Sequence, residues 1–255
     1  MKSCLFIPNS DPAITGHFPN NPIIPAALLL DQIALKFGEL TGKQVTTFAK
    51  VRISQPLLPE TDIDIKFEVL ETDRVRFTCA VSGDIAATGI LLTDHKTSEK
   101  KPPFQVCGED MRIDAEPLYR KLPHAGDMQL VDCILNYSDN EIHCRIKNNS
   151  LTDNTKTGSD YHWLILEYAA QALACHGLLI NGENINQQAE FNLSHVRIVA
   201  VNSLYCCRHQ GTDINNSSIT VRVWLDSFIS NAGRCSFEAF TEDTFLGKGG
   251  FTVNF

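Results

Sequence analysis

The chain has 255 residues, of which 43% are hydrophobic and 20% charged, so it exceeds the usual size of one domain and can form a substantial folded core. Its formal net charge of −8 argues against a nucleic-acid partner, because neutralising phosphates requires an excess of Lys and Arg. The longest apolar stretch, at 23–30, is far shorter than the roughly 20 residues of a membrane-spanning helix. The apolar run near the N-terminus is too short for the core of a signal peptide, so export is not expected. Nine cysteines without a C-x-x-C spacing favour reduced thiols in a cytoplasmic protein, and neither a metal nor a cofactor is expected.

The first part of the chain has the pattern of one helix followed by strands. Apolar residues at helical spacing predict a helix from Pro25 to Leu40, and a proline in the first helical turn loses no hydrogen bond. Alternating runs rich in Val, Ile, Phe and Thr then predict four strands, at 45–54, 62–71, 75–81 and 85–92. The charged stretch 94–103 ends in two prolines and has no apolar periodicity, so it is the best candidate for a linker.

The second part of the chain repeats the combination of one helix and several strands. A helix is predicted at about 161–179, with Gly177 and Gly182 as candidate ends. The predicted strands are 129–136, 141–146, 195–207, 219–225, 235–241 and 249–253. This order predicts an α+β protein in which each half wraps an antiparallel sheet on a central helix. We expect one domain at 1–97, a linker at 98–113 and a second domain at 114–255.

The candidate catalytic residue of the first half lies in the loop before its helix. The segment GHFPNNPIIP, at 16–25, is dense in Pro and Asn, so it is expected to hold His17 in a fixed position. A helix N-terminus disfavours the charged imidazolium, which keeps such a histidine usable as a base. An acidic residue, Asp31, follows 14 positions later on the helix. Taken alone, a loop histidine is more often structural than catalytic.

This loop resembles the G-H-F-x-x-x-P-x-x-P-G motif of the hotdog-fold 3-hydroxyacyl-ACP dehydratases, in which an acidic residue also lies 14 positions beyond the histidine. The stretch FAKVRISQPLLP, at 48–59, is similar to the strand and turn F-x-x-P-V-x-P-G of that family. Asn20 and Ala26 stand where the family has glycines. The resemblance implies that the backbone N–H at position 26 polarises the thioester carbonyl, which alanine still allows. The alanine at position 26 is therefore expected to affect which acyl chains are preferred more than the type of reaction.

The second half resembles the same family in three ordered blocks. The segments LPHAGDMQLVD at 122–132, KNNS at 147–150 and LEYAAQA at 166–172 are similar to its L-P-H-x-x-x-x-L-L-V-D, K-N-V-S and L-E-x-x-A-Q motifs. No G-H-F loop lies between Ser150 and Glu167. In the family, the histidine of one hotdog unit faces the helix carboxylate of another. The resemblance thus implies a fused double hotdog in which His17 faces Glu167, and Asp31 belongs to a second site that lacks a histidine and is inactive.

The resemblance implies dehydration of 3-hydroxyacyl thioesters to trans-2-enoyl thioesters, in fatty-acid or polyene and polyketide-type biosynthesis. With His162 and Trp163 before its helix, the second half is particularly similar to one dehydratase partner of aryl polyene clusters. The elimination needs a base, a polarised carbonyl and an acid. The expected roles are His17 as base, the N–H of Ala26 as electrophile and Glu167 as acid, with Gln171 orienting Glu167 from the next turn of the helix.

Several alternatives remain open from the sequence. Asp31 is a second candidate partner of His17, His162 could replace the missing loop histidine, and His124 is expected to be structural. The hotdog fold also hosts thioesterases, and a degenerate copy could serve only as a scaffold that binds acyl carrier protein. The substrate carrier is either acyl carrier protein or coenzyme A, and a homodimer of double-hotdog units is a further option. An acidic carrier could dock on a few basic residues, although a solvated linker is the favoured explanation for them: Lys100, Lys101, Arg112, Arg120 and Lys121.

Overall fold

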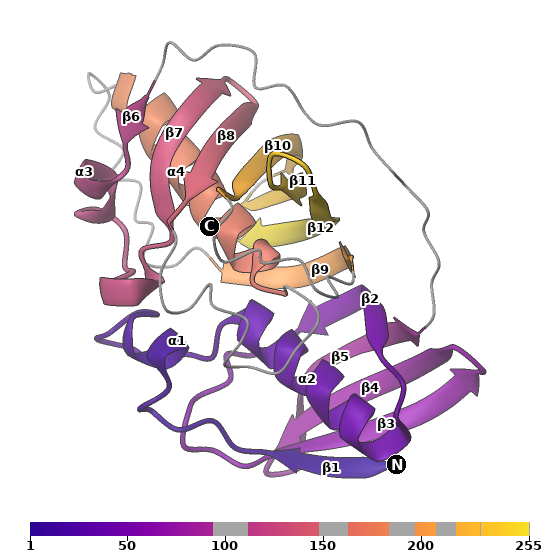
Figure 1. Ribbon diagram of the computed structural model, residues 1–255. Coiled ribbons are helices and arrows are strands. Elements are labelled where there is room, and N and C mark those ends of the chain that lie inside the picture. Colours follow the sequence, from indigo (N-terminus) through magenta and orange to yellow (C-terminus); the bar gives the residue numbers. More distant parts are fainter. Residues whose placement is uncertain (94–111, 148–162, 184–196, 208–217, 230, 255) are drawn as a thin grey trace.

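The computed structural model describes residues 1–93, 112–147, 163–183, 197–207, 218–229 and 231–254. Two helix-and-sheet units follow one another along the chain (Figure 1). Most of the expected linker, 98–111, lies outside the described residues. None of the helices in the described part has the length and apolarity to cross a bilayer.

The first unit is a sheet that packs on one long helix, α2 (Ala26–Thr41). On β3, Ile63, Ile65 and Phe67 are buried while the residues between them are exposed, so one face of the strand points inward. Helix α2 buries Leu29, Ile33 and Phe37, and the ring of Phe37 lies 5.3 Å from that of Phe67 on this face. The remaining elements are β1 (Lys2–Leu5), α1 (Pro12–Thr15), β2 (Val45–Ile53), β3 (Ile63–Glu71), β4 (Arg74–Val81) and β5 (Asp84–Thr93).

The second unit repeats this arrangement around helix α4 (Ile165–Glu183). This helix is buried more completely than α2, since Leu166, Tyr168, Ala169 and Ala172 have no exposed surface. The other elements are β6 (Ile113–Asp114), α3 (Glu116–Tyr119), the short 3-10 helix η1 (Gly126–Met128), β7 (Val131–Ser138), β8 (Glu141–Ile146), β9 (Arg197–Cys206), β10 (Thr220–Ile229), β11 (Ala232–Phe240) and β12 (Phe245–Asn254).

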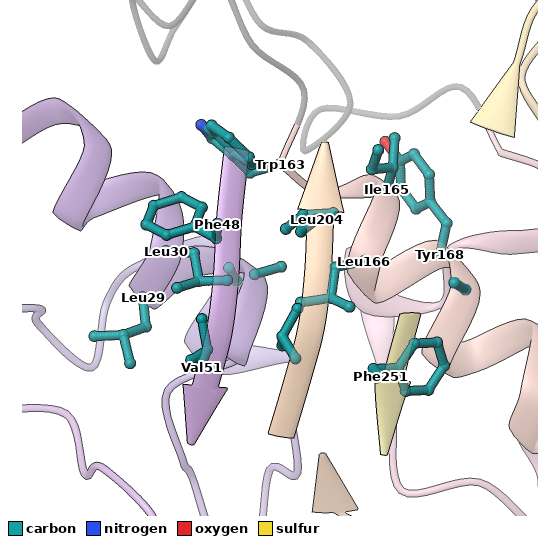
Figure 2. Close-up of a cluster of buried hydrophobic side chains, with 14 of the residues drawn as sticks. Leu29, Leu30, Phe48, Val51, Trp163, Ile165, Leu166, Tyr168, Leu204 and Phe251 are labelled. Carbon is teal, nitrogen blue, oxygen red and sulfur yellow. The ribbon is translucent and has the colours of Figure 1, made fainter. Parts of the chain in front are cut away.

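The two sheets join edge to edge through β2 and β9. These strands pair antiparallel from Thr47 opposite Tyr205 to Arg52 opposite Ala200. The result is one 12-stranded sheet with the order β1-β3-β4-β5-β2-β9-β12-β11-β10-β8-β7-β6. Side chains from both units meet at this junction, where Phe48 of β2 lies beside Trp163 and near Leu204 (Figure 2). Because the junction is a continuous backbone ladder, the two units are held in a fixed register.

The predicted α+β architecture is confirmed, although β10 continues past the predicted end at 225 to Ile229 and β12 begins at Phe245 instead of 249. Two further differences have a physical reason. The first is at the end of α4, which continues through Gly177 to Glu183. A helical glycine costs only about 1 kcal/mol relative to alanine, which the burial of α4 outweighs. The second is the set of elements of two to four residues that periodicity cannot detect, namely β1, α1, β6, α3 and η1.

Candidate active site

The loop that follows α1 fixes the position of His17. Asp11 caps α1 by accepting a hydrogen bond from Ala13 N (2.9 Å), and His17 N donates to the carbonyl of Ile14 (3.1 Å). The imidazole is only 6% exposed, and its Nδ1 lies 2.9 Å from the carbonyl oxygen of Ile23. A carbonyl can only accept, so Nδ1 carries the proton and Nε2 keeps its lone pair. The sequence expectation of a rigidly held base is consistent with this geometry.

The same loop touches the second unit directly. Ala125 N donates to the carbonyl of Gly16 (2.9 Å), and His17 and His124 form an isolated antiparallel bridge. The two imidazole rings lie 5.4 Å apart between centroids. The contact is so close that a Cβ on Gly16 would lie 2.3 Å from the carbonyl oxygen of Ala125. This bridge therefore sets the distance between the histidine loop and the second unit.

Glu167, in the first turn of α4, is 3% exposed and is held by its neighbour one turn later. Gln171 Nε2 donates to Glu167 Oε1 (2.9 Å) and to the carbonyl of Met128 (2.9 Å). Gln171 Oε1 in turn accepts from Tyr119 Oη (2.7 Å) and Leu130 N (3.1 Å). These four hydrogen bonds fix the amide, so Gln171 can orient the carboxylate, as expected from their spacing on one helix face.

The fold brings His17, His124 and Glu167 together. One nitrogen or oxygen atom of each lies within 4.8 Å of those of the other two, and His124 Nε2 is 3.3 Å from Glu167 Oε1. Asp31 is not a member of this group, and its carboxylate accepts from Gln32 Nε2 (3.3 Å). His162 lies outside the described residues. Of the two candidate carboxylates, the structure thus places Glu167 next to His17.

His124 is the functional candidate that the sequence did not reveal. A structural role was expected for it, yet its ring lies in the cavity wall against Glu167. Its Nδ1 is buried and has no hydrogen-bond partner among the described residues. The only sequence signal was its place in the L-P-H motif, because the contact with Glu167 depends on the packing of α4 against the segment before η1.

The electrostatics of the cluster favour a neutral His17 beside an ionised Glu167. Burial alone raises the pKa of Glu167, but the hydrogen bond from His124, the charges of His17 and His124 and the hydrogen bond from Gln171 together lower it to about 2. Burial lowers the pKa of His17, and His124 adds to this effect, while the charge of Glu167 and the hydrogen bond to Ile23 oppose it. At neutral pH, His17 therefore has an unprotonated Nε2, as a general base requires.

These groups line a cavity of about 440 Å³ between the two units. The N-terminal residue of α2, Ala26, contributes to its wall together with Ile24 and Leu29. As the first residue of a helix, Ala26 has a backbone N–H without an intrahelical acceptor. A mainly apolar cavity with a few converging polar groups is typical of small-molecule sites. Its polar lining consists of His17, His124, Glu167, Ser54, Gln55, Arg197 and Asn254.

The pKa of His17 should respond in opposite directions to its two neighbours. We expect an apparent pKa below 6.5 in the native protein, a further decrease in Glu167→Gln, and an increase in His124→Gln, because Glu167 stabilises the imidazolium and His124 opposes it. An NMR titration of the His17 ring in the three proteins measures this. A pKa above 6.5, or equal values in all three proteins, would contradict the described electrostatics.

A methyl group at Gly16 should disturb the cluster from a distance. In Gly16→Ala the new Cβ meets the Ala125 carbonyl and the Met128 side chain, so we expect a loss of about 1–3 kcal/mol of unfolding free energy and an activity lower by about 10–100-fold. The matched control is Gly177→Ala, where a Cβ meets nothing within 4 Å in a helix and should add about 0.5–1 kcal/mol. Urea unfolding compares the two, and equal shifts would contradict the close contact at Gly16.

Comparison with known proteins gives consistent relatives for both units. Residues 1–90 match the ApeI-like family model (ApeI dehydratase), and residues 116–190 match the ApeP-like model (ApeP dehydratase). The 3-hydroxyacyl-(acyl-carrier-protein) dehydratase FabZ of Histophilus somni is 34% identical over 97 residues, covering 32% of this chain and 64% of the relative. FabZ of Haemophilus influenzae is 31% identical over 106 residues, covering 36% of this chain and 72% of the relative. The chain thus spans about two thirds of the length of these curated relatives.

Solved structures extend the similarity over the whole chain. The dehydratase domain of a mycocerosic acid synthase-like PKS has a TM-score of 0.77 and 13% identity, covering 100% of this chain and 90% of that one. The dehydratase domain of PpsC from Mycobacterium tuberculosis, solved with C12:1-CoA, has a TM-score of 0.72 and 11% identity, covering 99% and 92%. At these identities the likeness concerns the fold, and it confirms the double hotdog.

Proposed function

Because this chain belongs to the FabZ family of hotdog 3-hydroxyacyl-ACP dehydratases, we propose that it removes water from 3-hydroxyacyl thioesters to give trans-2-enoyl thioesters. The observation that carries the proposal is the meeting of His17 and Glu167, from opposite units, in one cavity. The ApeI-like and ApeP-like matches of the two units favour polyene-type over ordinary fatty-acid synthesis. We assign the two units to 1–97 and 114–255, joined by a linker at 98–113.

His17 is the proposed base. Its Nε2 has a free lone pair and takes the proton from C2 of the substrate, next to the thioester carbonyl. The electron pair of the broken C–H bond forms the C2–C3 double bond, and the hydroxyl group leaves C3. The proposed electrophile is the N–H of Ala26, which donates to the thioester oxygen as negative charge develops there.

Glu167 delivers the proton that turns the leaving hydroxyl into water. Its low pKa means that the resting carboxylate is ionised, so the proton has to reach it during the reaction. The imidazolium formed at His17 lies within reach of Glu167, directly or through one water, and can pass on the proton taken from C2. The cycle then closes without a net proton change. In this scheme His124 and Gln171 are positioning residues that hold the carboxylate.

The proposed site is one per chain. Asp31, the helix carboxylate of the first unit, would need a histidine loop from the second unit, and the sequence has none in the corresponding place. We therefore propose that Asp31 is the remnant of a second site and takes no part in catalysis. This assigns the base to the first unit and the acid to the second.

The carrier, location and assembly belong to the same proposal. An acyl carrier protein is the favoured carrier, because the FabZ relatives are named for acyl-carrier-protein substrates. The nine cysteines of the sequence have no C-x-x-C spacing, which supports a reducing compartment such as the cytoplasm. The protein could also form a homodimer of double-hotdog units. Light scattering measures the molar mass and so distinguishes a dimer from a monomer of 28.3 kDa.

Mass spectrometry of the acyl group tests the reaction. The purified protein is incubated with a 3-hydroxyacyl-ACP and, separately, with the matching coenzyme A thioester. Loss of one water from the acyl group, retained in Asp31→Asn, is the expected result. Release of a free acid would show that the protein is a thioesterase and would contradict the proposal. An unchanged thioester on both carriers would favour a non-catalytic scaffold. An inactive Asp31→Asn with a native melting temperature would overturn the single-site assignment.

A further inference from the structure

The three buried groups of the site have the composition of a metal site. Two imidazoles and one carboxylate converge so that one donor atom of each lies within 4.8 Å of those of the other two. They lie far apart in the sequence, at positions 17, 124 and 167, so no spacing typical of metal ligands predicted the site. We propose that His17, His124 and Glu167 bind a divalent transition-metal ion, Zn²⁺ above all, and that the bound ion inhibits the proposed dehydration.

The distances are close to those of a zinc site. Zinc bonds of about 2.0–2.2 Å in a tetrahedron place neighbouring donors about 3.2–3.6 Å apart. His124 Nε2 and Glu167 Oε1, at 3.3 Å, already have that separation. His17 would need to approach by no more than about 1.5 Å to complete this geometry.

The surroundings of His17 and Glu167 resemble those that orient metal ligands in proteins. A metal-bound histidine commonly donates its other ring N–H to a carbonyl or carboxylate, as His17 Nδ1 does to Ile23 O (2.9 Å). A metal-bound carboxylate is commonly held by a further hydrogen bond, which Gln171 Nε2 supplies to Glu167 (2.9 Å). All three ligands line the cavity, so an ion has an entry path and room for a fourth, non-protein ligand.

The donor set selects among metals. Imidazole nitrogens suit Zn²⁺, Co²⁺ and Ni²⁺, whereas Mg²⁺ prefers sites made only of oxygen. Metal binding requires both imidazoles in their deprotonated, neutral form, so the ligand set of a bound ion would carry one negative charge, from Glu167. Binding would use the Nε2 lone pair of His17 and the carboxylate of Glu167. Inhibition follows from the proposed function, because the same lone pair is its base.

Cobalt spectroscopy tests the site without reference to activity. Titration of the purified protein with Co²⁺ should give visible d–d bands that saturate at one equivalent per chain and disappear when Zn²⁺ is added. His17→Asn and Glu167→Gln should each weaken Co²⁺ binding at least 10-fold. His143→Asn is the matched control, since His143 is likewise buried and contacts a glutamate, Glu141, but does not line the cavity; it should bind Co²⁺ normally.

Three outcomes overturn the proposal. They are the absence of d–d bands, equal bands in the His17 and Glu167 variants, or a thiolate charge-transfer band that assigns the metal to cysteines. If the protein is a dehydratase, Zn²⁺ should abolish the reaction, EDTA should restore it, and Mg²⁺ should have no effect. Cobalt binding with undiminished turnover would overturn the inhibitory part alone. Cobalt binding in a protein without dehydratase activity would leave the metal site standing and refute the proposed function.

Discussion

Replacing His17 with asparagine is expected to lower kcat/KM for the dehydration by about 10²–10⁴-fold, the usual contribution of a positioned general base. Asparagine can still hydrogen-bond to the Ile23 carbonyl but has no basic nitrogen to accept the proton from C2. The fold should be retained, because the substitution removes a buried group whose charged form is disfavoured there. The measurement is steady-state formation of the enoyl thioester, with the melting temperature followed in parallel.

The companion variant of His17→Asn is Glu167→Gln, which keeps the shape of the side chain and the hydrogen bond to Gln171 Nε2. We expect a similar loss, and a double variant that is hardly slower than either single one, because base and acid act in one step. Losses that multiply in the double variant would show that the two groups act independently. A wild-type rate of dehydration in His17→Asn would contradict the assignment of His17 as the general base.

The largest expected effect on stability comes from Phe48, whose replacement by alanine should reduce the free energy of unfolding by about 3–5 kcal/mol. Its fully buried ring makes edge contacts with Trp163 (4.8 Å between centroids) and Phe77 (5.9 Å). The variant removes packing at the junction of both units (Figure 2). Phe6→Ala, at a position 52% exposed, is the matched control and should cost less than about 1 kcal/mol.

Urea unfolding followed by tryptophan fluorescence measures both phenylalanine variants. The coupling between Phe48 and Trp163 can be isolated by a double-mutant cycle with Trp163→Leu, where about 0.5–1.5 kcal/mol is expected for an aromatic pair. A coupling energy of zero would mean that the two rings share space without stabilising the junction. An equal cost at Phe48 and Phe6 would contradict the buried packing.

The longer elements could be predicted from hydrophobic periodicity because each buries one regular face. Strand β8 runs from Glu141 to Ile146 as predicted, and α2 differs from its prediction by one residue at each end. The shared register of the two sheets could not be predicted, since the pairing of β2 with β9 depends on contacts between residues far apart in sequence. Periodicity reports which face of a strand is buried and says nothing about its neighbour.

The candidate site was predictable only in part for the same reason. His17 and Glu167 each lie in a motif with a fixed local spacing. That they face one another was inferred from the resemblance to a family whose active site combines two hotdog units. The place of His124 depends on the bridge between its backbone and that of His17, which no local pattern encodes. Because His124 contacts Glu167, the site contains three converging side chains, whereas the sequence predicted only the pair of His17 and Glu167.

The pairing of β2 with β9 also fixes the order in which a newly synthesised chain can assemble. Strands β3, β4 and β5 pair with neighbours close in sequence, so their hairpins can form while the ribosome is still translating the second unit. The partner of Thr47 is Tyr205, and until β9 has been made one edge of β2 is an unpaired strand. Such an edge is a template for aggregation, which makes the nascent chain most vulnerable in the interval before β9 has been synthesised. The cavity with its histidines and glutamate can close only after that interval, so a truncated product of this gene would be both inactive and prone to aggregate.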